Sequence, residues 1–143
     1  MTTVRQLLQT KGHKVISVAP NSAVYDAIQL MADKNISALS VLEHNRLVGI
    51  FTERDYARKV VLKGKASPTT LVAEVMSRNP VCVVPDQTVE QCMAIMTDKT
   101  IRHLPVLENN NLVGIVSIGD LVKSIIQEKE YIIDQLGHYI QGV

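Results

Sequence analysis

The feature that most constrains this chain of 143 residues is an internal repeat. When the numbering is shifted by 65, residues 15–61 align with residues 80–126 without a gap, and 17 of the 47 aligned positions are identical. The densest match joins residues 47–50 to residues 112–115, both of which read Leu-Val-Gly-Ile. An ungapped match of this length is not an accident of composition. We therefore interpret the chain as a duplication of one structural unit.

Each copy carries the same succession of sequence patterns. Apolar residues at helical spacing predict amphipathic helices, and β-prone runs separated by turn-like residues predict hairpins. In the first copy the predicted elements are a strand over 15–18, a helix from 24 to about 31, strands over 36–42 and 47–51, and a helix over 56–62 that Gly64 ends. In the second copy the helix stripe recurs at residues 89, 92, 93 and 96.

Two further helices are expected at the ends of the chain. Thr3 and Gln6 fit a capping box that begins a short N-terminal helix, which Gly12 ends. Residues 120–140 carry apolar side chains at helical spacing and predict one long or gently broken helix. That helix extends beyond what the repeat needs. We therefore expect its apolar face to pack on a partner subunit or back across the pair of repeats.

The clearest linker is residues 65–70, which read Lys-Ala-Ser-Pro-Thr-Thr. We divide the chain there into a first repeat with the N-terminal helix, residues 1–68, and a second repeat with the C-terminal extension, residues 69–143. A unit of roughly 60 residues is marginal alone. Two α+β units packed face to face would bury both sheets and leave a cleft with pseudo-twofold symmetry, a favoured place for ligands.

Composition and charge narrow the classes of function. The net charge of +1 gives no basic field that would hold nucleic acid. No run of about 18 apolar residues is present to span a membrane, and the N-terminus lacks the apolar core of a secretory signal. The four His and two Cys lack the spacing of metal ligands. We therefore expect a cytoplasmic protein with no metal and with neither nucleic acid nor membrane as partner.

The motif that suggests chemistry is a hydroxyl residue followed three positions later by an acid. It occurs as Thr52 with Asp55 and as Ser117 with Asp120, each time after a Gly-containing apolar strand. Amides at a helix start bind phosphate with the help of the hydroxyl, and a carboxylate accepts hydrogen bonds from ribose hydroxyls. The alternative is a helix cap with an acid in the first turn. The recurrence of the motif, with different residues between cap and acid, favours a ligand site.

Taken together, these residues resemble two cystathionine-β-synthase (CBS) domains, and the chain is similar to a stand-alone CBS pair. The resemblance covers roughly residues 1–128. It rests on Pro-Asp-Gln-Thr-Val at 85–89, on Ile-Arg-His-Leu-Pro-Val at 101–106, and on the two hydroxyl-x-x-Asp endings. It implies β-α-β-β-α units packed with pseudo-twofold symmetry and two clefts between them. Such clefts bind AMP, ADP, ATP, NAD(H) or S-adenosylmethionine, and the family usually associates as a homodimer.

The resemblance also implies roles for individual residues. In the family the acid of the motif holds the ribose and the hydroxyl meets the phosphate, which gives Asp55 and Asp120 with Thr52 and Ser117. Adenine lies between apolar side chains and reads the backbone of the first strand of the hairpin. The residues expected around adenine are Ile36, Ser37, Ala38, Ile101 and His103, with Ile16 and Val81 as walls.

Arg102 distinguishes the two halves, because its counterpart in the first repeat is Ser37. An Arg beside a phosphate makes bidentate, charge-assisted hydrogen bonds. We therefore expect Arg102 to make the Asp120 cleft the tighter site for an anionic ligand, unless it is an exposed Arg at a strand edge. Arg54 is expected to add charge to either cleft or to face solvent.

The sequence thus predicts an adenine-nucleotide-binding regulatory module, for energy or redox sensing, with no required cofactor and no catalytic residue. AMP is the first choice of ligand, NAD(H) the next, and ATP, ADP and S-adenosylmethionine are alternatives. We expect a homodimer that signals to an unknown effector protein. The alternative is a protein interaction or dimerisation module whose clefts stay empty, in which the hydroxyl-x-x-Asp motifs are caps alone.

Overall fold

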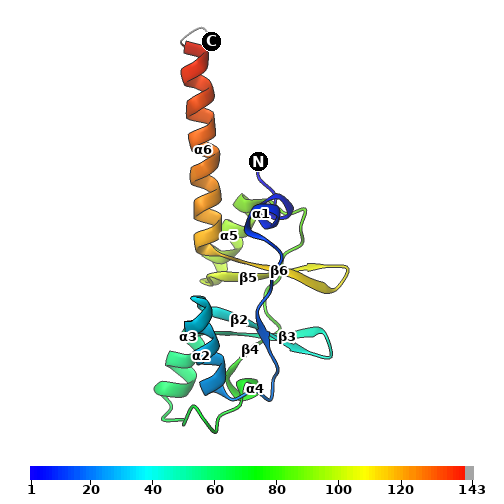
Figure 1. Cartoon of the computed structure of the whole chain (residues 1–143), viewed down its shortest axis with the longest axis vertical. Coiled ribbons are helices and arrows are strands. Elements are labelled where there is room, and N and C mark those ends of the chain that lie inside the picture. The colour runs from blue at the N-terminus through cyan, green and yellow to red at the C-terminus, as the bar shows by residue number, and fades with distance from the viewer. Residues whose placement is uncertain (141–143) are drawn as a thin grey trace.

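The computed structural model describes residues 1–140; residues 141–143, at the end of the predicted second unit, lie outside the described residues. It is an α+β fold, as predicted (Figure 1). The elements in chain order are α1 (Val4–Lys11), β1 (Ser17–Val18), α2 (Val24–Lys34), β2 (Ala38–Glu43), β3 (Arg46–Thr52), α3 (Glu53–Asp55), the π-helical turn η1 (Tyr56–Val61), α4 (Val72–Val75), β4 (Ser77–Arg78), α5 (Val89–Lys99), β5 (His103–Glu108), β6 (Asn111–Ser117) and α6 (Ile118–Ile140).

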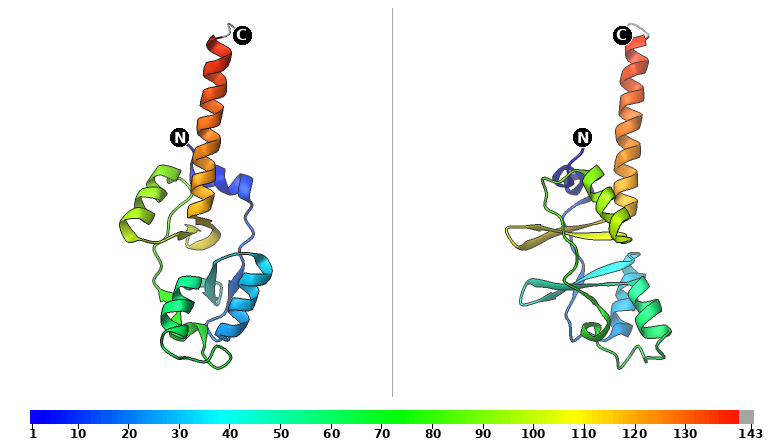
Figure 2. Two further views of the ribbon diagram at one scale, coloured as in Figure 1. Left: turned by 90° about the vertical axis from the view of Figure 1, so that its left-hand side faces the viewer. Right: turned by 180° about the vertical axis from the view of Figure 1, so that it is seen from behind.

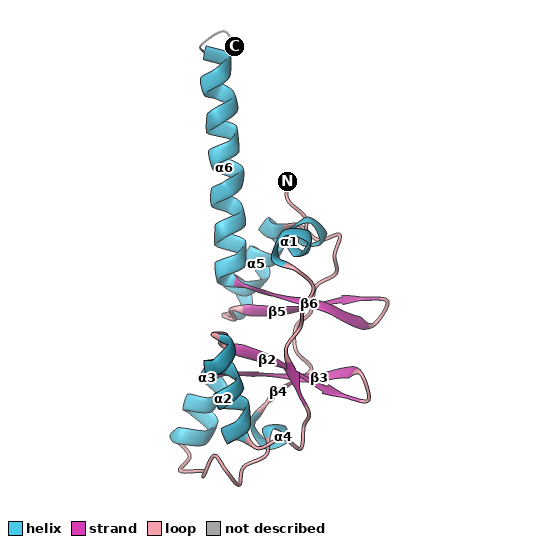
Figure 3. Cartoon of the chain, in the orientation of Figure 1, coloured by secondary structure: helices cyan, strands magenta, loops and turns pink. Residues whose placement is uncertain are grey.

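Each predicted hairpin forms, and the two are stacked with their turns pointing to the same side (Figure 3). The first belongs to a four-stranded sheet in the order β1-β2-β3-β4, in which β1 runs parallel to β2. The second is the pair β5-β6, and one parallel bridge from Val83 to Val106 takes the place of the β1–β2 pairing. Both hairpins carry an irregularity at the same repeat position, after Val41 and after Val106. The duplication therefore extends to strand register.

The hydrophobic cores are assembled by an exchange of short helices between the halves. Val4, Leu7 and Leu8 of α1 are buried in the second core, with α5, β5 and β6. Val72 and Val75 of α4 are buried in the first core, with α2, β2 and β3. In Figure 1 the blue α1 accordingly lies in the upper half beside α5, and α4 lies in the lower half. Packing thus crosses the sequence division at residues 68 and 69.

Gly49 and Gly114, at matched positions of the repeat, make room for this exchange. A Cβ atom built on Gly114 would lie 2.7 Å from Cδ2 of Leu8 in α1. A Cβ atom built on Gly49 would lie 2.6 Å from Sδ of Met76 and 2.9 Å from the carbonyl oxygen of Ser77, beside β4. A side chain at either position would collide with the segment packed on that hairpin, so the glycines are explained by close packing.

The terminal helices form where the sequence predicts them. Thr3 caps α1 by a capping box with Gln6, and Gly12 ends the helix. The predicted tail helix is α6, which begins at Ile118 and is continuous to Ile140. Its first turns pack on α5 and the second core, and the rest projects away from the body (Figure 2). None of the helices described here is long and apolar enough to cross a bilayer.

Candidate ligand clefts between the repeats

Two open cavities lie between the halves, and each combines the apolar residues of one repeat with the hydroxyl-x-x-Asp motif of the other. The Asp120 cleft, of about 800 Å³, is lined by Ile16 and Ile36 from the first repeat and by Ser117 and Asp120 from the second. The Asp55 cleft is larger, about 1200 Å³, and shows the reverse combination. Its apolar wall includes Val81 and Ile101, and its motif is Thr52 with Asp55.

All thirteen residues predicted for the site line one of these clefts. Their role in ligand binding stays a prediction, but the structure does bring them together. Those of the Asp120 cleft are Ile16, Ile36, Ser37, Ala38, His103, Ser117 and Asp120. Those of the Asp55 cleft are Ser37, Thr52, Arg54, Asp55, Val81, Ile101, Arg102 and His103. Ser37 and His103 are shared.

The expectation that Arg102 serves the Asp120 cleft is wrong. Arg102 lines the Asp55 cleft instead. The reason is the crosswise arrangement: the backbone of Arg102 accepts a hydrogen bond from the amide of Ile118, beside the motif of its own hairpin, but Arg102 lines the cavity that contains Thr52 and Asp55. Arg54 also lines the Asp55 cleft, and its guanidinium donates a hydrogen bond of 2.9 Å to the carbonyl oxygen of Thr100 across the two halves.

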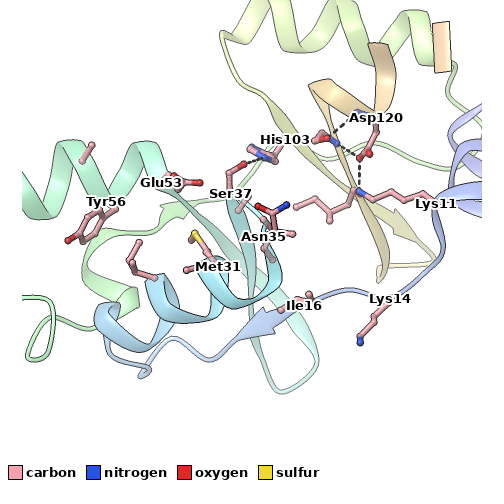
Figure 4. A pocket seen from close by; sticks show the side chains of 17 residues that line it. Lys11, Lys14, Ile16, Met31, Asn35, Ser37, Glu53, Tyr56, His103 and Asp120 are labelled. Atoms are coloured by element: carbon pink, nitrogen blue, oxygen red, sulfur yellow. Dashed lines mark hydrogen bonds and ion pairs between the residues drawn. The ribbon is translucent and has the colours of Figure 1, made fainter. Parts of the chain in front are cut away.

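Asp120 is held at the start of α6 with one carboxylate oxygen in use. Oδ2 accepts hydrogen bonds from the Ser117 amide at 2.8 Å and from Nζ of Lys11 at 2.6 Å (Figure 4). Oδ1 makes no hydrogen bond to any residue that the structure describes. Burial raises the pKa of Asp120, but the hydrogen bonds from Lys11 and Ser117 outweigh it and hold that pKa below its ordinary value. The carboxylate is therefore ionised at neutral pH, with one oxygen available.

Asp55 has the same place in the repeat but different surroundings. Its Oδ1 accepts a hydrogen bond of 3.0 Å from Oγ of Ser77 and lies 3.0 Å from Nζ of Lys59. Its Oδ2 accepts hydrogen bonds from the amide and the hydroxyl of Thr52, at 3.1 and 3.2 Å. Asp55 is only 7% exposed. Both carboxylate oxygens are thus occupied by protein groups.

The wall between the clefts is a contact between the repeats. Oγ of Ser37 lies 3.0 Å from Nε2 of His103 (Figure 4), and both residues line both cavities. Burial and the nearby Lys11 lower the pKa of His103, against an opposing effect of Asp120. His103 is therefore neutral at pH 7, as expected for a residue of the cleft and the repeat interface. Among the described residues no three His, Cys, Asp or Glu gather as metal ligands.

Lys11 and Ser77 are the site residues that sequence reasoning missed. Lys11 ends α1 and reaches Asp120, and Ser77 begins β4 and reaches Asp55. Both sit on segments that precede one repeat and pack on the other. The only pattern in the sequence that bears on these two residues is the apolar face of the short helix beside each one. That face does not indicate which of the two cores the helix packs in.

Comparisons with known proteins agree on one family. A model of the CBS domain matches residues 4–62 and 72–127. Over 150 residues the chain is 36% identical to CBS domain-containing protein CBSX3, mitochondrial, of Arabidopsis thaliana, covering 99% of this chain and 73% of that protein. A putative signal-transduction protein with CBS domains from Burkholderia ambifaria MC40-6 has 50% identity and a TM-score of 0.85, over 88% of this chain and 95% of that one.

A third similar structure was solved with ligands. The CBS domain pair of protein MJ0100, in complex with 5′-methylthioadenosine and S-adenosyl-L-methionine, is 26% identical with a TM-score of 0.80. The match covers 90% of this chain and 98% of that one.

Proposed function

The chain belongs to the CBS-domain family, and we propose that it is a regulatory module that binds an adenosine-containing molecule in the Asp120 cleft. The observation that carries this proposal is the unused Oδ1 of Asp120, a residue that lines a cavity together with apolar side chains of the first repeat. A carboxylate oxygen in that position can accept a hydrogen bond from a ribose hydroxyl. The two adenosine compounds bound by the MJ0100 domain pair support the same class of ligand.

The other groups of the cleft suit the remaining parts of such a ligand. Ile16, Met31 and Ile36 offer apolar surface to adenine. Ser117 offers its hydroxyl as a donor to a phosphate, whereas the amides of Ile118 and Asp120 already donate to Arg102 and Ser117. The lining contains two lysines, Lys11 and Lys14, against two acids, Glu53 and Asp120, so its charge balances. This balance favours a ligand with few phosphates: AMP remains the first choice, followed by NAD(H), with S-adenosylmethionine, ADP and ATP as alternatives.

The proposed mechanism is sensing by differential affinity. A ligand in the Asp120 cleft touches both repeats and α1, so it favours the arrangement of the halves that it binds best. An effector protein then reads that arrangement.

We propose no chemical step, since the cleft offers hydrogen bonds, charge and apolar surface without a nucleophile beside a base. Incubation of the pure protein with NADH or ATP, followed by analysis for products, tests this part. A cytoplasmic location stays a prediction that cell fractionation tests.

Calorimetric titration of ligand-stripped protein tests the ligand site. AMP, NAD, NADH, ATP and S-adenosylmethionine are titrated into the wild type, into Asp120→Ala and into the control Asp134→Ala, whose exposed acid lies on α6 outside the cleft. We expect at least one ligand to bind the wild type and the control equally. Asp120→Ala should weaken it about tenfold or more, the usual cost of one charge-assisted hydrogen bond.

A second candidate function is a protein interaction module with empty clefts. The exposed apolar side chains of α6, such as Ile133 and Leu136, favour it. In that case none of the five ligands gives heat with the wild type. Asp120→Ala would then lower only the thermal stability, because the residue would act as the cap of α6 and the partner of Lys11.

A further inference from the structure

The two clefts differ most in charge. The lining of the Asp55 cleft carries six cationic side chains against two acidic ones, whereas the lining of the Asp120 cleft carries two of each. The cationic residues of the Asp55 cleft are Arg54, Arg58, Lys59, Arg78, Lys99 and Arg102, and its acids are Glu53 and Asp55. Four positive charges are therefore in excess around one cavity, in a chain whose whole net charge is +1.

The protein itself neutralises little of this charge. Asp55 pairs with Lys59 at 3.0 Å, and Lys99 lies 3.9 Å from Asp98 in an exposed pair. Arg58 and Arg102 form no ion pair with any residue that the structure describes. Arg58 comes from the first repeat and Arg102 from the second, so unneutralised cations from both halves line the same cavity. Such like charges repel, and a multivalent anion between them would relieve the repulsion.

The carboxylate of this cleft is also less available than its counterpart. Both oxygens of Asp55 are bonded within the protein, by Ser77, Lys59 and Thr52. A ribose would have to displace one of these groups, whereas Oδ1 of Asp120 needs no such displacement. Recognition in the Asp55 cleft therefore depends less on ribose and more on negative charge.

We propose that the Asp55 cleft is a second, separate site, selective for a chain of two or three phosphates, beside a low-charge adenosine site in the Asp120 cleft. This proposal rests on the proposed nucleotide-binding function and divides it between the two cavities. Arg is the residue best suited to clamp phosphate oxygens bidentately. The volume of about 1200 Å³ and the apolar wall of Val81, Met96 and Ile101 leave room for a nucleoside attached to the phosphates.

The test uses the full-length protein and inorganic tripolyphosphate, in a buffer free of divalent cations at about 0.15 M salt, where diffuse attraction is screened within about 8 Å. The variants are Arg102→Ser, which installs the residue of the first repeat, and Arg58→Ser. The matched control is Arg46→Ser, an exposed Arg at the start of β3 and outside both clefts. We expect tripolyphosphate to bind the wild type and Arg46→Ser equally, and each cleft variant about tenfold more weakly.

Further arms distinguish the source of the phosphates and separate this proposal from the first one. If ATP and GTP bind the protein as tightly as tripolyphosphate does, the phosphate chain alone is recognised; if ATP binds more tightly, adenine is recognised too. Either result supports the site, provided that Arg102→Ser weakens the binding. Tripolyphosphate binding that survives in Asp120→Ala, together with AMP binding that survives in Arg102→Ser, supports two separate sites. An equal loss in Arg46→Ser and Arg102→Ser would overturn the proposal. So would AMP binding in the Asp120 cleft without any affinity for polyphosphate, and the function proposed above would then stand alone.

Discussion

Among single residues, the twin glycines differ in what their missing side chains would meet. At Gly49 an added methyl group would lie 2.9 Å from the carbonyl oxygen of Ser77, a backbone atom that moves only with β4. At Gly114 it would meet the methyl groups of Leu8, whose side chain can change rotamer. We expect Gly49→Ala to lower the free energy of unfolding by about 1–3 kcal/mol, and Gly114→Ala by less. Urea denaturation measures both, and a larger loss for Gly114→Ala would contradict this explanation.

His103 gives the stability a pH dependence. Burial, Lys11 and Arg102 lower its pKa below 6.5, while Asp120 opposes them. As the pH falls below 6.5, His103 takes up a proton in the unfolded chain before it does so in the folded chain. The free energy of unfolding therefore decreases until the pH reaches the folded-state pKa of His103, and above pH 6.5 this group has no effect on it. The lowered pKa of Asp120 acts only below about pH 4, where the stability from its ionised form is lost.

His103→Gln should therefore flatten the pH profile. Urea unfolding of the wild type and the variant at about pH 7.5 and about pH 5.5 measures the change. We expect the wild type to lose more free energy of unfolding between these values than the variant does. An identical loss in both proteins would mean that other groups set the pH dependence.

Among the secondary-structure elements, those whose own residues form a clear pattern could be predicted from the sequence. The apolar stripe from residue 24 gives α2, the β-prone runs give both hairpins, and Thr3 with Gln6 gives the capped start of α1. The exchange of α1 and α4 has no such signal, because each short apolar face would fit either aliphatic core. Their places depend on backbone bridges between distant segments, Thr3 to Thr88 and Ala23 to Leu71. The cleft reached by Arg102 depends on the same crossing, which is why its assignment from sequence failed.

The exchanged packing predicts which of the two cores a mutation in α1 destabilises. Leu8 is 1% exposed and belongs to the second core. Leu8→Ala should lower the free energy of unfolding by about 2–5 kcal/mol through the cavity it leaves. The amides of β5 and β6 should lose more hydrogen-exchange protection than those of β2 and β3. Leu62→Ala, which truncates a side chain that is 77% exposed, is the control and should change little. Protection lost mainly from β2 and β3 would contradict the exchanged packing.

In the molecule as a whole, each cleft is lined by both repeats, so a ligand bound there would depend on how the two repeats are arranged. A ligand in either cavity contacts both halves, and the Ser37–His103 contact is shared by both sites. The repeat makes the apolar walls alike, while Arg102 in place of Ser37 and the occupied carboxylate of Asp55 make the sites unequal. Duplication thus supplies two clefts, and divergence at a few positions gives them the different linings on which the two proposals rest.

The projecting part of α6 points to the predicted homodimer. Ile132, Ile133 and Leu136 are 50%, 68% and 56% exposed. In proteins most of the stability of a helix comes from packing of its apolar face. Residues 122, 125, 129, 132 and 136 follow the alternating three- and four-residue spacing of a coiled-coil seam, apolar at every position except Lys129. Ile125 already packs on the second core, so the exposed apolar residues of this stripe are Val122, Ile132 and Leu136. A second copy of the chain offers the same stripe, so we propose that α6 pairs with α6 of another subunit.

Sedimentation at tens of micromolar tests this pairing. We expect the wild type to be dimeric and the double variant Ile132→Asp, Leu136→Asp to be monomeric, because buried unpaired carboxylates are costly at such a seam. The hairpins and both cores do not involve these two residues, so thermal unfolding of the body should be retained. Asp134→Asn, on the opposite side of α6, is the matched control and should stay dimeric. A wild type that is monomeric with and without nucleotide would exclude the homodimer, and a dimeric double variant would place the interface away from α6.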